Sequence, residues 1–231
     1  MKMKKVGIIA AMQEEMEAIK KIMEDISEIE IYNLKFITGK INNKECVLVE
    51  SGVGKVNASR TTQILIDKFE IEYIINVGSA ATASEELQIG DIVIGETLVQ
   101  HDFDITAFGH KKGYISNVGE NVKSDTKLIE KFKQTINDIE NKEYKIKIGT
   151  IASGDIFCTE NIMKQKIHSK FNADAIEMEG AAIAQVCYLD KIPFIIVRSI
   201  SDNPNGQNNI TFEEYLELAS KRCSEILKNV I

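Results

Sequence analysis

The chain has few of the cysteines that would indicate a disulfide framework or a structural metal site. Its 231 residues include four cysteines, Cys46, Cys158, Cys187 and Cys223, which are widely separated and form no CxxC pair. This spacing favours neither paired disulfides nor a zinc knuckle. Unpaired thiols of this kind are typical of proteins that work in a reducing compartment.

Positive charge is outweighed by negative charge, with 28 Lys and Arg against 35 Asp and Glu. The formal net charge is −7, and the lysines are scattered beside glutamates, as in Glu130, Lys131 and Lys133. A long polyanion is bound through clustered Lys and Arg, so nucleic acid is not an expected partner. With only two prolines, 44% hydrophobic and 27% charged residues, the composition is that of a folded globular chain without disordered segments.

No apolar run approaches the length of a transmembrane helix. Residues 1–5 are basic like the start of a signal peptide, but the apolar run at 6–12 is short, ends at once in Gln13, Glu14 and Glu15, and has no cleavage signal after it. We therefore expect a cytoplasmic protein that has no membrane partner.

Short apolar runs alternate with amphipathic stretches along the whole chain, a pattern typical of an α/β fold with buried strands between helices. We find no repeat and no domain boundary, so one domain over 1–231 is expected. Strands are predicted at 5–10, 29–38, 45–50, 73–77, 92–99, 144–152, 174–178 and 193–200. Helices are predicted at 13–24, 55–69, 125–140, 159–170, 180–189 and 211–230, with a long loop at 101–121.

Finer features are predicted within these elements. A turn at Asn42 and Asn43 should join two strands, and the helix at 55–69 should carry Val56, Ile64, Leu65 and Phe69 inward. The last helix should open with a capping box at residues 211 and 214.

Four predicted strands end in polar side chains, at residues 11–15 (AMQEE), 78–80 (GSA), 177–179 (EME) and 198–202 (RSISD). Reactive groups of α/β sheets gather at the carboxyl ends of strands. Enzymes that cleave glycosidic bonds commonly use carboxylates in different environments, since one donates a proton and another activates water. Each could instead be a helix cap or a partner of the helix dipole. Their recurrence at four strand ends favours a site.

Two other motifs carry less information. Residues 52–55 (GVGK) precede a helix but lack the spacing of a P-loop and the third glycine of a dinucleotide fingerprint, which indicates a tight strand-to-helix turn. His101, Asp102, Asp104 and His110 lie close in sequence but match no metal-ligand spacing. We expect neither a metal nor a cofactor.

The chain resembles the bacterial 5'-methylthioadenosine/S-adenosylhomocysteine nucleosidases in seven motifs that follow the order of the family. They are residues 7–16 (GIIAAMQEEM), 51–56 (SGVGKV), 76–80 (NVGSA), 101–109 (HDFDITAFG), 153–155 (SGD), 177–184 (EMEGAAIA) and 197–202 (VRSISD). The resemblance implies an α/β three-layer sandwich of the nucleoside phosphorylase type, with a mixed central sheet flanked by helices, in a homodimer.

The resemblance also implies catalytic roles. Asp202 matches the residue that protonates N7 of adenine, and Glu15 matches the base that orients and deprotonates the attacking water. Glu179 matches the carboxylate that holds the ribose hydroxyls and faces the positive charge on the sugar.

Further positions are implied for substrate binding. Phe157 should stack on the purine, the backbone of Cys158 should read its edge, and the backbone of Met178 should lie beside the ribose. Ser79 and Arg198 should orient the carboxylates. Val53, Glu177, Ser201 and Phe212 complete the set, together with Ile105 and Phe108, which are expected to enter the partner subunit's pocket.

Two departures from the family pattern affect the surroundings of this site. Ala81 and Thr82 stand where the family has two glycines, which makes the adjacent loop stiffer. A proline common in the partner-contributed loop is replaced near Ser116. Both changes concern the pocket for the 5' substituent, and neither concerns a catalytic role.

Two rival functions can be set beside hydrolysis. A phosphorylase of the same fold would need cationic groups or a glycine-rich nest for phosphate, whereas Gln13, Glu14 and Glu15 would repel a dianion. A non-catalytic nucleoside-binding protein would not need Glu15, Glu179 and Asp202 together. The sequence leaves open the preferred 5' substituent and the use of 5'-deoxyadenosine or futalosine-type nucleosides.

Overall fold

The computed structural model describes residues 4–139, 142–201 and 212–231, with the backbone alone at residues 212 and 213. The strands are β1 (Lys5–Ala10), β2 (Glu24–Ile31), β3 (Leu34–Ile41), β4 (Lys44–Glu50), β5 (Ile71–Thr82), β6 (Ile92–Gln100), β7 (Val122–Lys123), β8 (Ile146–Ser153), β9 (Ala173–Glu177) and β10 (Phe194–Ile200). The helices are α1 (Gln13–Lys20), α2 (Lys55–Lys68), α3 (Thr126–Asp138), α4 (Asn161–Phe171), α5 (Gly180–Asp190) and α6 (Phe212–Val230), with a 3-10 turn at Thr106–Phe108.

One mixed sheet contains all these strands, in the order β10-β6-β8-β9-β5-β1-β4-β3-β2. β7 pairs with β6, and β10 pairs also with β5, so that part of the sheet closes into a ring. β5 is shared: it runs parallel to β1 and β10 and antiparallel to β9 at its end. The carboxyl ends of β1, β5 and β10 therefore lie at the same edge of the sheet.

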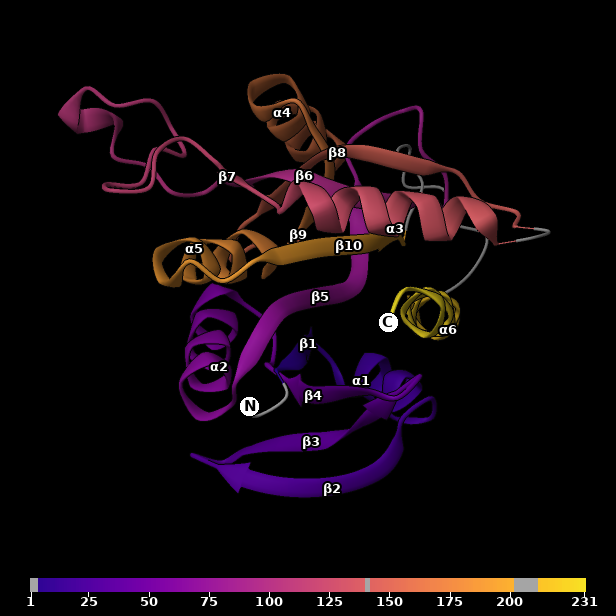
Figure 1. Ribbon diagram of the computed structural model, residues 1–231. Coiled ribbons are helices and arrows are strands. Elements are labelled where there is room, and N and C mark those ends of the chain that lie inside the picture. Colours follow the sequence, from indigo (N-terminus) through magenta and orange to yellow (C-terminus); the bar gives the residue numbers. More distant parts are fainter. Residues whose placement is uncertain (1–3, 140–141, 202–211) are drawn as a thin grey trace.

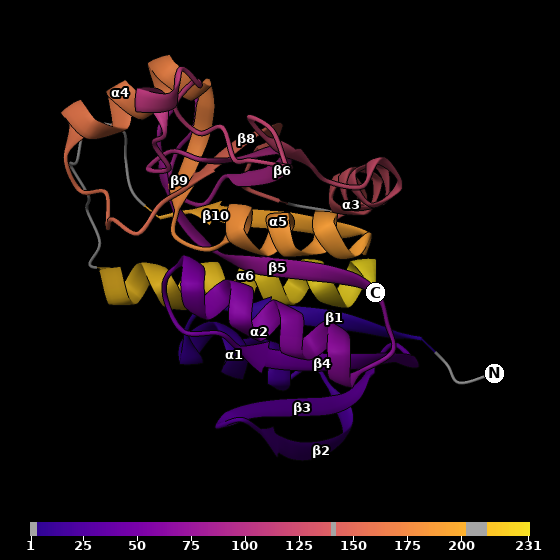
Figure 2. The ribbon, with the colours of Figure 1, turned by 90° about the vertical axis from the view of Figure 1, so that its left-hand side faces the viewer.

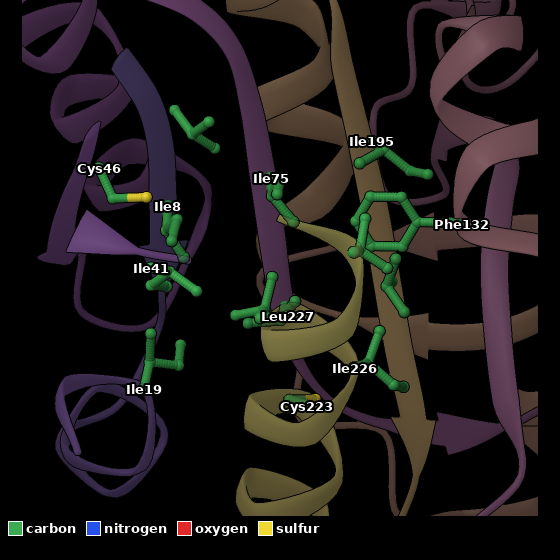
Figure 3. Close-up of a cluster of buried hydrophobic side chains, with 14 of the residues drawn as sticks. Ile8, Ile19, Ile41, Cys46, Ile75, Phe132, Ile195, Cys223, Ile226 and Leu227 are labelled. Carbon is green, nitrogen blue, oxygen red and sulfur yellow. The ribbon is translucent and has the colours of Figure 1, made fainter. Parts of the chain in front are cut away.

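Helices cover both faces of the sheet (Figures 1 and 2). On one face α1, α3 and α6 pack over an apolar core in which Ile19, Phe132 and Leu227 meet Ile75 and Ile195 of the sheet (Figure 3). On the other face α2 and α5 lie together over a second core. α4 packs on β8 and β9. Among the described helices, none is long and apolar enough to cross a membrane.

The α/β class and the mixed sheet flanked by helices are confirmed, and most predicted elements are present with ends shifted by a few residues. Asn42 and Asn43 form the predicted turn, each with a positive φ. In the helix Lys55–Lys68, Leu65 is buried and Ile64 packs against the second core, as does Phe69, which directly follows the helix. The capping box predicted at residue 211 lies outside the described residues.

Three details of the prediction were wrong. The strand predicted at 29–38 is a hairpin, because Tyr32 and Asn33 both adopt positive φ and make a two-residue turn between β2 and β3. The helix predicted at 13–24 ends at Lys20. The N–H groups of residues 22 and 23 bond to carbonyls three residues earlier in a tight turn, and Glu24 then pairs with Lys40 in the sheet. Val56 is 78% exposed rather than inward-facing, since it lies on the outer side of the first turn of α2.

The segment between β6 and β7, residues 101–121, projects to one side of the molecule (Figure 1), although Gly113 lies close to Phe171 of α4 and Val118 packs against the second core. We call it the arm. It contains the 3-10 turn Thr106–Phe108, and Asp104 Oδ1 accepts hydrogen bonds from the backbone N–H and the hydroxyl of Thr106. Phe108 at this turn is 81% exposed, whereas Ile105 is partly buried. The ring of Phe108 is therefore accessible to another molecule.

Candidate active site

Arg198 is the centre of a charged cluster at the shared strand edge. It lies on β10 and is fully buried, and its Nη2 atom donates to Asn76 Oδ1 at 2.6 Å and to Glu177 Oε2. The same nitrogen lies 3.7 Å from Glu179 Oε2. The guanidinium also acts electrostatically on Glu15. A buried charge is costly unless it is paired, so these carboxylates stabilise Arg198 and it stabilises them.

Glu177 is held entirely by protein groups. Its Oε1 atom accepts a hydrogen bond from the hydroxyl of Ser153. Its Oε2 atom accepts from the backbone N–H groups of Glu179, at 3.0 Å, and Gly180, at 2.7 Å, in addition to Arg198. This carboxylate at the end of β9 therefore fixes both the start of α5 and the guanidinium.

Glu179, at the beginning of α5, has fewer protein partners. Its Oε1 atom accepts from the backbone N–H of Gly54 at 2.9 Å, and the residue is only 5% exposed. Burial, and next the negative charge of Glu177, raise its pKa from 4.5 to about 7, although Arg198 opposes the shift. A carboxyl that changes its charge near neutral pH is a frequent mark of a functional site.

Glu15 occupies the first turn of α1, directly after β1. Its Oε2 atom accepts the backbone N–H groups of Ala11, at 3.0 Å, and Met12, at 3.2 Å. Its Oε1 atom accepts the N–H of Ser79 on β5, at 3.1 Å. Burial raises the pKa of Glu15 despite the opposing effects of Arg198 and these three donors. The side chain caps its own helix, as the simpler interpretation required, but it also joins two strands at the cluster.

Gly78 shows how closely these groups approach the backbone of β5. A Cβ atom at this position would lie 2.6 Å from Arg198 Nη1 and 2.8 Å from Glu15 Oε1. Neither atom could move far, because both side chains are buried and held. The glycine therefore lets β5 pass between the guanidinium and the carboxylate.

The other predicted site residues lie around this cluster. Val53, in the loop that supplies the Gly54 N–H, is 47% exposed, and Phe157 is 67% exposed, while Cys158 beside it is buried. Met178 lies between the two glutamates of the cluster and is partly buried. Ser201 follows β10 and bonds to the carbonyl of Ala80 through its N–H at 2.8 Å and its hydroxyl at 3.0 Å.

The structure thus brings together Glu15, Ser79, Glu177, Glu179 and Arg198, and it places Ile105 and Phe108 on the arm. Asp202 and the side chain of Phe212 lie outside the described residues, so their roles stay predictions.

Sequence reasoning missed three contributors to the cluster, which are Asn76, Ser153 and the backbone of Gly54. Asn76 could have been found, because it is a polar residue inside an apolar strand, and its Nδ2 atom donates to the carbonyl of Ile9 at 2.9 Å. Ser153 lies in a motif to which no role was given, and its hydroxyl also accepts from the N–H of Ala181 at 2.7 Å.

No group of three or more His, Cys, Asp or Glu side chains in the described parts of the chain could hold a metal ion. His101 is buried and Asp102 pairs with Lys55, whereas His110 stacks on Tyr114, with ring centroids 4.2 Å apart. These side chains do not converge on a common point.

The class of protein can now be stated. Residues 5–231 match the family model of the phosphorylase superfamily, and the observed fold agrees with this class. A nucleosidase for 5'-methylthioadenosine and S-adenosylhomocysteine from Staphylococcus haemolyticus is 44% identical over 227 residues, which cover 98% of each chain. The chain therefore belongs to the 5'-methylthioadenosine/S-adenosylhomocysteine nucleosidase family within that superfamily.

Solved structures agree with this placement. The nucleosidase of the same kind from Neisseria meningitidis, in complex with methylthio-immucillin-A, superposes with a TM-score of 0.91 at 34% identity and covers 99% of this chain and 98% of its own. The futalosine hydrolase of Helicobacter pylori also has a TM-score of 0.91 and 34% identity, covering 98% of this chain and 97% of its own.

The raised pKa of Glu179 predicts how stability depends on pH. The folded state binds a proton at Glu179 more tightly than the unfolded state, so its contribution to stability is full below pH 4.5 and is lost as pH rises through about 7. The free energy of unfolding should fall between pH 5 and pH 8 by about 2–3 kcal/mol more in the wild type than in Glu179→Gln, which cannot titrate.

Urea denaturation at both pH values would measure this difference. Glu14→Gln is a suitable control, because Glu14 is exposed and adjacent to the site, and it should keep the wild-type pH dependence. If Glu179→Gln and the wild type gave parallel curves, the carboxyl would have an ordinary pKa.

Proposed function

We propose that the chain hydrolyses the N-glycosidic bond of 5'-methylthioadenosine and S-adenosylhomocysteine, releasing adenine and the 5-thioribose product. The observation that carries this proposal is the pair of buried carboxylates, Glu15 and Glu179, which share one guanidinium and both have raised pKa values. Glycosidic-bond cleavage requires carboxyl groups in distinct environments, and these two differ in their backbone partners.

Each carboxylate has a role that its surroundings support. Glu15 takes the proton of the attacking water, which suits a buried carboxylate with a raised pKa because such a group is a stronger base. Glu179 binds the ribose hydroxyls and faces the cationic sugar of the transition state. Arg198, Glu177 and Ser79 orient both. Asp202 protonates N7 of adenine, a role that rests on the sequence resemblance.

Water is favoured over phosphate as the attacking group. Glu14 and Glu15 follow β1 directly, and within the described part of the site the one arginine, Arg198, is fully buried against carboxylates. A phosphate dianion would meet negative charge there rather than a cationic nest. A futalosine-type nucleoside is a second candidate substrate because of the solved hydrolase of Helicobacter pylori described above.

Incubation with a panel of adenine nucleosides and futalosine, with and without phosphate, tests the proposal. Free 5'-methylthioribose and adenine should accumulate from 5'-methylthioadenosine at the same rate in both buffers, because water is the nucleophile. Chromatography with mass detection would identify the sugar. Formation of 5'-methylthioribose 1-phosphate would show that the reaction is phosphorolysis and not hydrolysis. Turnover of futalosine alone would show that futalosine is the substrate.

The neighbouring glutamates Glu14 and Glu15 form a matched pair for the general base. Glu15→Gln should lower kcat by about 100-fold or more, because an amide cannot accept the proton of water. Glu14→Gln makes the same chemical change one residue earlier, at an exposed side chain, and should keep kcat within about twofold. Steady-state kinetics on 5'-methylthioadenosine measure both. Comparable kcat values in the two variants would exclude Glu15 as the base.

We also propose that the single domain, residues 1–231, works as a symmetric homodimer in which the arm completes the partner's site. The exposed Phe108 and the projection of the arm to one side of the molecule support this assembly (Figure 1). Ile105 and Phe108 would form an apolar wall for the thioether group, which offers little hydrogen bonding. We place the reaction in the cytoplasm, which is supported by four buried cysteines that form no disulfide with one another. Nucleic acids and membranes are not proposed as partners.

The apolar wall predicts a substrate-dependent effect. Phe108→Ala should raise KM for 5'-methylthioadenosine by about tenfold and KM for adenosine by much less, because only the former loses an apolar contact of roughly 1–3 kcal/mol. Ile29→Ala, on an exposed face of β2, is the control and should change neither constant. Equal losses on the two substrates, or an active monomer, would show that the arm has another purpose.

A further inference from the structure

Lys55, Asp102 and Asp155 form a compact charged cluster outside the carboxylate site, which we call the Lys55 triad. Lys55 Nζ lies 2.6 Å from Asp102 Oδ1 and 3.9 Å from Asp155 Oδ2. The backbone N–H of Lys55 donates to Asp155 Oδ1 at 2.8 Å, and the N–H of Asp155 donates to Asp102 Oδ2 at 2.8 Å. Three segments far apart in sequence are thus joined in a closed triangle.

The Lys55–Asp102 pair is less exposed than a surface ion pair, whereas the side chain of Asp155 is about half exposed. The Lys55 side chain is 15% exposed and that of Asp102 is 19% exposed. Lys55 Nζ also donates to Gln100 Oε1 at 3.2 Å, and Gln100 is itself held by Gln185 at 2.7 Å. Burial raises the pKa of Asp102, but the hydrogen bonds from Lys55 and from the Asp155 N–H lower it overall, so the carboxylate stays charged.

Each residue of the triad is adjacent in sequence to a different part of the proposed site. Lys55 follows Gly54, whose N–H holds Glu179. Asp155 lies two residues before Phe157, in the segment expected to hold the purine. Asp102 is the second residue of the arm, which carries Phe108. The same small cluster therefore fixes two loops of its own subunit's site and the base of the segment that is proposed to enter the neighbour's site.

We propose that the Lys55 triad is a positioning unit that couples the two sites of the dimer: it holds the Gly54 and Phe157 loops for catalysis in its own subunit and sets the direction of the arm for substrate binding in the partner. This inference rests on the proposed function and on the proposed homodimer. Displacements of about 1 Å in positioning groups are enough to reduce rates by orders of magnitude. Loss of Lys55 should therefore act in both subunits, and in different ways.

Mixed dimers with two affinity tags separate the two effects. The reference is a wild-type chain paired with Glu15→Gln, which leaves one working site, built on the wild-type chain. When the inactive chain also carries Lys55→Met, the working site receives an altered arm. KM for 5'-methylthioadenosine should then rise about tenfold over the reference, with kcat changed by less than about twofold.

The reverse pair tests the effect within one subunit. When Lys55→Met is paired with Glu15→Gln, the working site has altered loops and an intact arm, so kcat should fall about tenfold or more. Lys44→Met is the control, because Lys44 makes an ion pair of the same 2.6 Å length with Glu72 far along the chain and should change neither constant in either pairing. If Lys55→Met does not fold, Asp102→Asn takes its place in both pairs.

The outcomes distinguish this inference from the proposed function. Release of adenine by the wild-type homodimer supports the function whatever the mixed dimers show. An unchanged KM when the altered arm serves a wild-type site would overturn the coupling, as would a wild-type protein that is monomeric and fully active. A general loss in both pairings that Lys44→Met reproduces would likewise reduce the triad to an ordinary structural contact.

Discussion

The buried charge of Arg198 is the constraint on which the rest of the site depends. A guanidinium with no access to water must be matched by carboxylates and hydrogen-bond acceptors, and here Asn76, Glu177 and Glu179 supply them. Those partners come from β5, the end of β9 and the start of α5. Because Glu177 also binds the first N–H groups of that helix, the charge match fixes helix and sheet together. The carboxylates of the proposed site are held in place by these contacts.

Much of the fold could be predicted because hydrophobic periodicity reports burial directly, so buried strands such as β1 and β10 were placed within a residue. The hairpin of β2 and β3 was missed, since its turn uses Tyr32 and Asn33 in place of a glycine. The closure of the sheet was missed for a different reason. Strand pairing is decided by contacts distant in sequence, and no local pattern in β5 indicates that β10 pairs with it.

The site was predicted unevenly for a related reason. Side chains at strand ends could be assigned from chemistry and resemblance, and Glu15, Glu179 and Arg198 do meet at one place. Backbone donors could not be assigned from the sequence, because almost every residue type carries an N–H. The donors from Gly54 and Ser79 depend on the path of the chain. A helix cap and a functional carboxylate are also not exclusive alternatives for one residue. Glu15 caps α1 with one carboxylate oxygen and joins β5 with the other.

The threefold pairing of β5, with β1, β10 and β9, has a consequence for motion. Local opening of a strand requires its ladder bonds to break on both sides, so residues 74–76, which pair with β1 and β10 at once, should open only with global unfolding. The arm has fewer such bonds, since β7 pairs with β6 at only two positions. Opening of the arm would therefore leave the doubly paired strand, and the carboxylates beside it, in place.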